Sequence, residues 1–216
     1  SVSRGLGDVY KRQPNTLEAI LALQAVVGLI ETAPKALYYL GNLWYDKRQY
    51  AEAVAAWEKS IEQDSEFPTV CRNLSLAYFN KLDRKQEAVA LLEKAFYLDT
   101  NDARILMELD QLYKRLNRPH KERLALLDAY KELTFSRDDL SLEYVTLLNQ
   151  LGRYEEALHL IDTRQFHPWE GGEGKVPAQY QLCRVQLVKE YLKSKEYKKA
   201  LQLIDAVSYT HLRAHE

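Results

Sequence analysis

Apolar residues recur along the chain at the three- and four-residue spacing of a helix with one buried face. Leu37, Leu40 and Trp44 form one such stripe, and Leu74 and Tyr78 belong to a second. Short polar turns, such as residues 46–49 and 151–153, separate the periodic segments, which predicts antiparallel helical hairpins. We expect helices near residues 16–31, 34–47, 50–63, 68–81, 85–98, 102–116, 119–133, 138–151, 154–163, 177–194 and 197–206.

A small residue recurs at a fixed place in the second helix of each predicted hairpin. It follows an acidic or polar pair and precedes an aliphatic run, and it occurs as Ala19, Ala53, Ala88, Ala157 and Ala200. The first two intervals are 34 and 35 residues, and the third spans two periods with a degenerate copy at residues 121–123. Gly41 and Ser75 are small residues at the matching place in two first helices. We expect helix backbones to approach closely at these positions.

The series Leu40-Gly41, Trp44, Tyr50, Ala53 and Trp57 is similar to the signature of the tetratricopeptide repeat, a 34-residue unit of two helices. This resemblance implies an all-α fold, a right-handed α-solenoid of antiparallel helix hairpins. About five and a half hairpins would cover residues 14–206. The first hairpin lacks its first helix and is expected to be a cut repeat.

The two ends of the chain differ from the periodic segment between them. One back-translation of Asp8–Gln13 is the reverse complement of DNA that encodes Val207–His211 in a shifted frame. Both ends resemble translated sequencing-adapter sequence. We therefore expect residues 1–13 and 207–216 to be artefacts, the former disordered, and residues 14–206 to be an internal piece of a longer protein.

Composition narrows the possible partners. The 216 residues carry 30 Lys+Arg and 31 Asp+Glu, a net charge of −1, so electrostatic binding of nucleic acid is not expected. No apolar run reaches the ~18 residues of a membrane span. The two cysteines, Cys71 and Cys183, lie on apolar stripes. They suit core positions in a reducing compartment.

First helices line the concave groove of such a solenoid, which is its usual partner-binding surface. We expect partner contacts from Tyr38, Asn42, Tyr45, Arg72, Asn73 and Phe79, with Leu76, Arg104, Glu108 and Tyr144 on the same surface. Asn42 and Asn73 match asparagines by which some tetratricopeptide domains hold a peptide carboxylate. Tyr38 stands where that clamp has a basic residue, which argues against a clamp. The alternative roles of the asparagines are polar groove contacts or hydrogen bonds between helices.

An insertion at residues 164–177 is rich in glycine and polar residues. One interpretation gathers His167, Glu170, Glu173 and Lys175 into a polar cluster that, with Trp169, contacts a partner or a neighbouring domain. The other is a structural loop held in place by its aromatic residues. No metal, cofactor or catalytic site is predicted, because the histidines lack ligand spacing and GGEGK is not a phosphate-binding loop.

The string FHPWEGGEGKVPAQY, followed by a helix and YKKAL, resembles the C-terminal half of a family of large bacterial proteins. These proteins carry an N-terminal β-rich domain of unknown function that is thought to be associated with carbohydrate. The resemblance implies a bacterial, cytoplasmic protein with any carbohydrate chemistry in that upstream domain. We expect the present segment to be a non-catalytic scaffold that binds a partner protein or its own upstream domain through the concave groove and the insertion at residues 164–177. Its alternative is a tail whose Glu170 or Glu173 completes a carbohydrate-active site in that domain.

Overall fold

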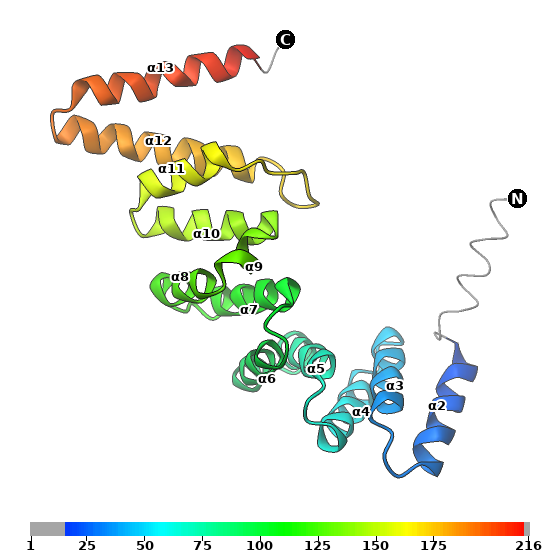
Figure 1. Ribbon diagram of the computed structural model, residues 1–216. Coiled ribbons are helices and arrows are strands. Elements are labelled where there is room, and N and C mark those ends of the chain that lie inside the picture. The colour runs from blue at the N-terminus through cyan, green and yellow to red at the C-terminus, as the bar shows by residue number, and fades with distance from the viewer. Residues whose placement is uncertain (1–15, 214–216) are drawn as a thin grey trace, which may run out of the picture. The chain divides into compact units, whose positions relative to one another are not determined.

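The computed structural model describes the backbone of residues 16–213 and the side chains of residues 16–205. Every regular element in that range is a helix, which confirms the predicted all-α class (Figure 1). The helices are α2 (Leu17–Leu29), α3 (Pro34–Asp46), α4 (Tyr50–Gln63), α5 (Pro68–Lys81), α6 (Lys85–Leu98), α7 (Ala103–Arg115), α8 (His120–Ala129), α9 (Lys131–Phe135), α10 (Asp138–Gln150), α11 (Tyr154–Thr163), α12 (Lys175–Lys193) and α13 (Tyr197–Arg213). Two compact units meet in sequence between Ile105 and Leu106.

The predicted adapter-like ends are only partly covered by this description. Residues 1–13 lie outside the described residues. Helix α13 continues to Arg213, beyond its predicted end at residue 206, and residues 214–216 again lie outside. The origin of both ends stays a prediction.

The first unit is built from the hairpins α3–α4 and α5–α6, with α2 packed on α3 and α4 packed on α5. Pro34 and Pro68 begin the first helix of each hairpin, where the missing N–H is not needed. Gln63, at the end of α4, accepts from the backbone N–H of Ala33 at 2.8 Å and donates to the carbonyl oxygen of Glu31 at 3.0 Å. This side chain therefore ties the α2–α3 turn to the first hairpin.

Small residues let the two helices of each hairpin in this unit meet closely. A Cβ atom at Gly41 would lie 2.4 Å from Nε1 of Trp57, whose indole donates to the carbonyl oxygen of Tyr38 at 3.2 Å. In the next hairpin, the buried hydroxyl of Ser75 donates to the carbonyl oxygen of Ala88 at 2.6 Å. The predicted close approach of helix backbones is supported at Ser75, whereas at Gly41 the space is filled by the Trp57 side chain rather than by the backbone of α4.

The second unit has one irregular helix pair, α8 and α9, where the sequence predicted a single helix over residues 119–133. Tyr130 leaves the helical conformation, with φ −115° and ψ 48°, and α9 then begins at Lys131. The hydroxyl of Thr134, which is fully buried, donates to the carbonyl oxygen of Leu127 at 2.8 Å. A side chain thus satisfies a carbonyl group at the end of α8, where helical partners run out.

A buried ion pair joins α7 to α8 in the second unit. Arg123 donates to both carboxylate oxygens of Asp110, at 3.0 and 2.7 Å, and each residue is at most 2% exposed. The same guanidinium also contacts Glu143 of α10 at 2.7 Å. Asp110 and Arg123 are 13 residues apart, the separation of Ser75 and Ala88 in the preceding hairpin. The degenerate repeat at residues 121–123 therefore replaces a pair of small residues with a pair of charges.

Burial and pairing shift the pKa values of this cluster in opposite directions. Burial raises the pKa of Asp110 despite its bonds to Arg123. Burial also acts to raise the pKa of Glu143, but hydrogen bonds from Lys114 and Arg123 lower it overall. Lys114 contacts Glu143 at 2.8 Å, so two cations face two carboxylates.

Candidate functional site

Two asparagines predicted to contact partners join neighbouring hairpins of the first unit. Nδ2 of Asn73, on α5, donates to Oδ1 of Asn42, on α3, at 3.1 Å. Arg72 donates in turn to Oδ1 of Asn73 at 3.2 Å. All three side chains are half-buried. We call the surface formed by Tyr38, Asn42, Arg72 and Asn73 the α3–α5 face.

Aromatic rings border the α3–α5 face. The ring of Tyr38 lies 5.1 Å from the rings of Tyr39 and Phe67, measured between centroids, and Tyr39 is 50% exposed. Edge and tilted contacts at this distance stabilise aromatic pairs. The face therefore combines amide and guanidinium groups with a partly exposed aromatic wall.

The other predicted groove residues are placed differently. The ring of Tyr45 lies 5.1 Å from that of Tyr50 and 5.5 Å from that of Trp57, so it packs on α4 within its own hairpin. Phe79 is half-buried on α5. The prediction that Tyr144 is a surface residue is wrong, because it is 3% exposed and its hydroxyl donates to Asp128 at 2.8 Å. Helical spacing alone did not separate its core position from a surface one.

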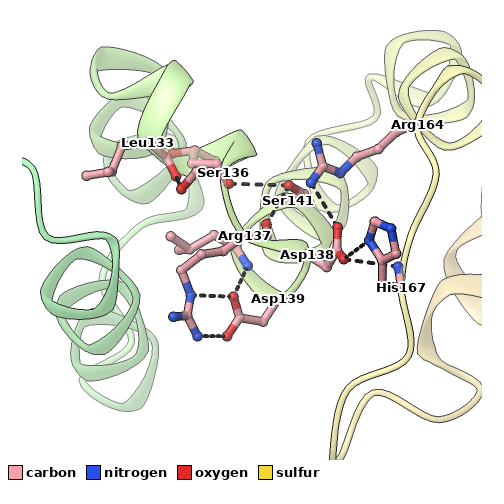
Figure 2. Close-up of polar contacts among 10 residues, drawn as sticks. Leu133, Ser136, Arg137, Asp138, Asp139, Ser141, Arg164 and His167 are labelled. Carbon is pink, nitrogen blue, oxygen red and sulfur yellow. Dashed lines mark hydrogen bonds and ion pairs between the residues drawn. The ribbon is translucent and has the colours of Figure 1, made fainter.

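The glycine-rich insertion of the second unit is anchored on Asp138, the first residue of α10 (Figure 2). Arg164 donates to one carboxylate oxygen of Asp138 at 2.8 Å. The backbone N–H and ring Nδ1 of His167 both lie 3.0 Å from the other oxygen. Burial acts to raise the pKa of Asp138, but these bonds lower it overall. Figure 2 shows both side chains directed at this one carboxylate.

The loop also lines an open pocket of about 280 Å³. Its lining residues are Phe166, His167, Pro168, Trp169, Gly172, Glu173, Gly174 and Val176. The indole of Trp169 covers Gly172 so closely that a Cβ atom there would lie 2.3 Å from Cε2. The N–H of Gly172 donates to the carbonyl oxygen of Trp169 at 3.0 Å, which closes the turn. We call this cavity the loop pocket.

The predicted polar residues of the insertion do not share one hydrogen-bonded cluster in the described part of the chain. Both His167 and Glu173 line the loop pocket, but the ring of His167 contacts Asp138 rather than Glu173. Glu170 is exposed and is not a lining residue. Lys175 is the first residue of α12, so the loop ends at residue 174 rather than 177. The role of Asp138 was not predicted from the sequence. The feature that could have indicated it is its place as an acidic residue at the start of a predicted helix.

Residues 34–67 match the family model for the tetratricopeptide repeat. The chain has the tetratricopeptide-repeat (TPR) fold. It is similar to YrrB, a TPR protein with an unusual peptide-binding site, at 19% identity over 85% of this chain and 89% of that one, with a TM-score of 0.59. A TPR protein from Parabacteroides merdae matches at 14% identity over 96% and 77%, with a TM-score of 0.59. PilF of Pseudomonas aeruginosa matches at 17% identity over 98% and 95%, with a TM-score of 0.58.

Other kinds of site receive no support from the described side chains. Among them, no group of three or more His, Cys, Asp or Glu side chains is placed to hold a metal ion. Cys71 and Cys183 are buried in the core as predicted, and burial raises the pKa of both thiols. None of the described helices combines the length and the apolar character needed to cross a membrane.

Proposed function

We propose that the chain is a non-catalytic protein-interaction module whose α3–α5 face binds an extended segment of a partner protein. The observation that carries this proposal is the chain of side-chain hydrogen bonds from Arg72 through Asn73 to Asn42. It holds two amide groups from different hairpins in a fixed relation on a partly exposed surface.

An extended peptide offers a backbone donor and acceptor at almost every residue. A side-chain amide has two N–H donors and a carbonyl oxygen. In the bond between the asparagines, Asn42 contributes only its carbonyl oxygen, as the acceptor from Asn73. The N–H donors of Asn42 suit a backbone carbonyl or a carboxylate of the bound segment. Tyr38 and Tyr39 supply the apolar contact that such a ligand needs beside its polar groups.

The solved structures with the same fold support this class of ligand. YrrB is described as a TPR protein with an unusual peptide-binding site. We extend peptide binding from that protein to the α3–α5 face of this chain. In the same proposal the chain is part of a larger bacterial protein that acts in the cytoplasm, and the insertion at residues 164–174 forms a second contact. The bound segment belongs to another protein or to an upstream domain of the same protein.

Peptide selection followed by substitution tests the proposal. A random peptide library is selected on the full chain, and the affinity of the best binder is measured by calorimetry. Asn42→Ala and Asn73→Ala should each weaken binding about 5- to 30-fold, the effect of losing one or two hydrogen bonds.

The matched control is Asn101→Ala, which makes the same chemical change in an exposed turn between α6 and α7. Its affinity should equal that of the unsubstituted chain, and thermal melting should show that all three variants fold. Equal affinity for all three variants would place binding elsewhere and overturn the proposal.

A further inference from the structure

The loop pocket has apolar and aromatic walls and one carboxylate. Phe166 and Trp169 contribute aromatic rings, and Pro168 and Val176 add aliphatic surface. Glu173 is the only acidic or basic lining residue apart from His167. Its side chain is exposed and makes no hydrogen bond or ion pair with the other described residues. The pocket therefore offers a negative charge beside aromatic rings.

The neighbouring charged groups form no ion pair with Glu173 among the described residues. Arg164 and the ring of His167 both contact Asp138, and the Arg164 guanidinium also lies 5.5 Å from the centroid of the Phe166 ring, which leaves Trp169 as the aromatic ring for an incoming cation. Lys175 is exposed on the first turn of α12 and is not a lining residue. Glu170, also exposed, adds a second negative charge to the same loop. A cation entering the pocket would meet a carboxylate whose charge is not already paired.

The pocket is held in shape by its own loop and by α10. The bonds to Asp138 fix the segment at Arg164 and His167, and the contact of Trp169 with Gly172 fixes the turn. Gly174 precedes α12 with φ +70°, a conformation that glycine adopts without strain. Because these restraints are present without a ligand, binding would lose little conformational entropy by ordering the loop.

The size of the pocket selects the kind of group that fits. A volume of about 280 Å³ lies at the lower limit of sites for small molecules and suits a single side chain. Aromatic rings attract a cation over their faces, and a guanidinium also stacks on them. A carboxylate at the rim adds a charge-assisted hydrogen bond.

We infer that the loop pocket binds the basic side chain, arginine or lysine, of a partner protein. This inference deepens the proposed function by naming the chemistry that the insertion recognises. It takes from that function only the assumption that the partner is a protein. It does not depend on the α3–α5 face.

The test uses small probes and the full chain labelled with ¹⁵N. The probe is N-acetyl-L-arginine amide, and its neutral control of nearly the same shape is N-acetyl-L-citrulline amide. The readout is the indole N–H signal of Trp169, assigned with Trp169→Phe. We expect a saturable shift with the arginine compound and about fivefold or more weaker binding of the citrulline compound.

Variants assign the charge effect to one residue. Glu173→Gln should reduce binding of the arginine compound to the level of the citrulline compound. The matched control Glu170→Gln should keep most of the preference, because Glu170 does not line the pocket. Equal binding of both probes, or a preference that survives Glu173→Gln, would overturn the inference. Asn42→Ala should leave the probe result unchanged, so failure at the α3–α5 face and failure here are separate outcomes.

Discussion

At the scale of single residues, the repeat depends on positions where no side chain fits. Gly41 is such a position, because the indole of Trp57 occupies the space that its Cβ atom would need. Gly28, in α2, has no atom within 4 Å of the place where a Cβ atom would lie. The two glycines therefore have different reasons to be present, although both lie in helices.

Replacing each glycine with alanine should separate the two cases. Gly41→Ala should lower the free energy of unfolding by about 1–3 kcal/mol, since either Trp57 or the backbone must shift. Gly28→Ala should leave it unchanged or raise it by up to about 1 kcal/mol, because alanine favours a helix. Urea denaturation measures both. Equal effects of the two substitutions would contradict the close packing at Gly41.

At the scale of helices, the ion pair of Asp110 and Arg123 joins the two helices of its hairpin at the positions that small residues occupy in the preceding hairpin. A buried charge that loses its partner is strongly destabilising, whereas removing both charges is often tolerated. This contrast makes the pair testable by a double-mutant cycle.

Arg123→Met keeps much of the side-chain volume and removes the cation that faces Asp110. We expect it to cost about 3–5 kcal/mol of unfolding free energy. Adding Asp110→Asn should recover part of that loss, because the amide carries no charge. Chemical denaturation of the two single variants and the double variant gives the coupling. Strictly additive effects would show that the two charges do not stabilise each other.

The contacts of Asp138 predict an acid-sensitive loop. The pKa of Asp138 is lowered in the folded protein, so its stabilising effect is present above its ordinary pKa of about 4 and is lost as the pH falls through the lower folded value. Below about pH 4 the loop should loosen, which a change in the indole signal of Trp169 would report.

Asp138→Asn should produce the loosened signal at neutral pH and abolish this acid transition. Asp139→Asn is the matched control, because Asp139 also has a lowered pKa but pairs with Arg137. A transition that persists in Asp138→Asn would assign it to another group.

Periodicity predicted the bounds of most helices because their buried faces are local in sequence. It failed where a contact joins distant residues. At the break after Ala129, the hydroxyl of Thr134 bonds to the carbonyl oxygen of Leu127. At residues 121–123 the repeat pattern showed only a degenerate copy, because the role of Arg123 depends on its ion pair with Asp110, 13 residues earlier. The anchor of the loop joins Asp138 to His167 across 29 residues. Such hydrogen-bond partners are brought together by the packing of the helices, and the spacing of residues along the chain does not reveal them.

At the scale of the whole molecule, the TPR fold provides repeated surfaces rather than a single reaction centre. The first unit carries the α3–α5 face, and the second carries the loop pocket. A net charge of −1 supplies no general attraction to polyanions, so binding must come from local groups on these surfaces. The place where a peptide binds therefore tests the proposed function most directly.

The most direct measurement maps the selected peptide onto the chain by the ¹⁵N signals of its side-chain amides and backbone. If the α3–α5 face binds the peptide, the largest shifts on its addition will occur at the side-chain amides of Asn42 and Asn73 and in the surrounding turns of α3 and α5. Saturable binding that leaves these two amides unchanged and shifts other helices would contradict binding at this face.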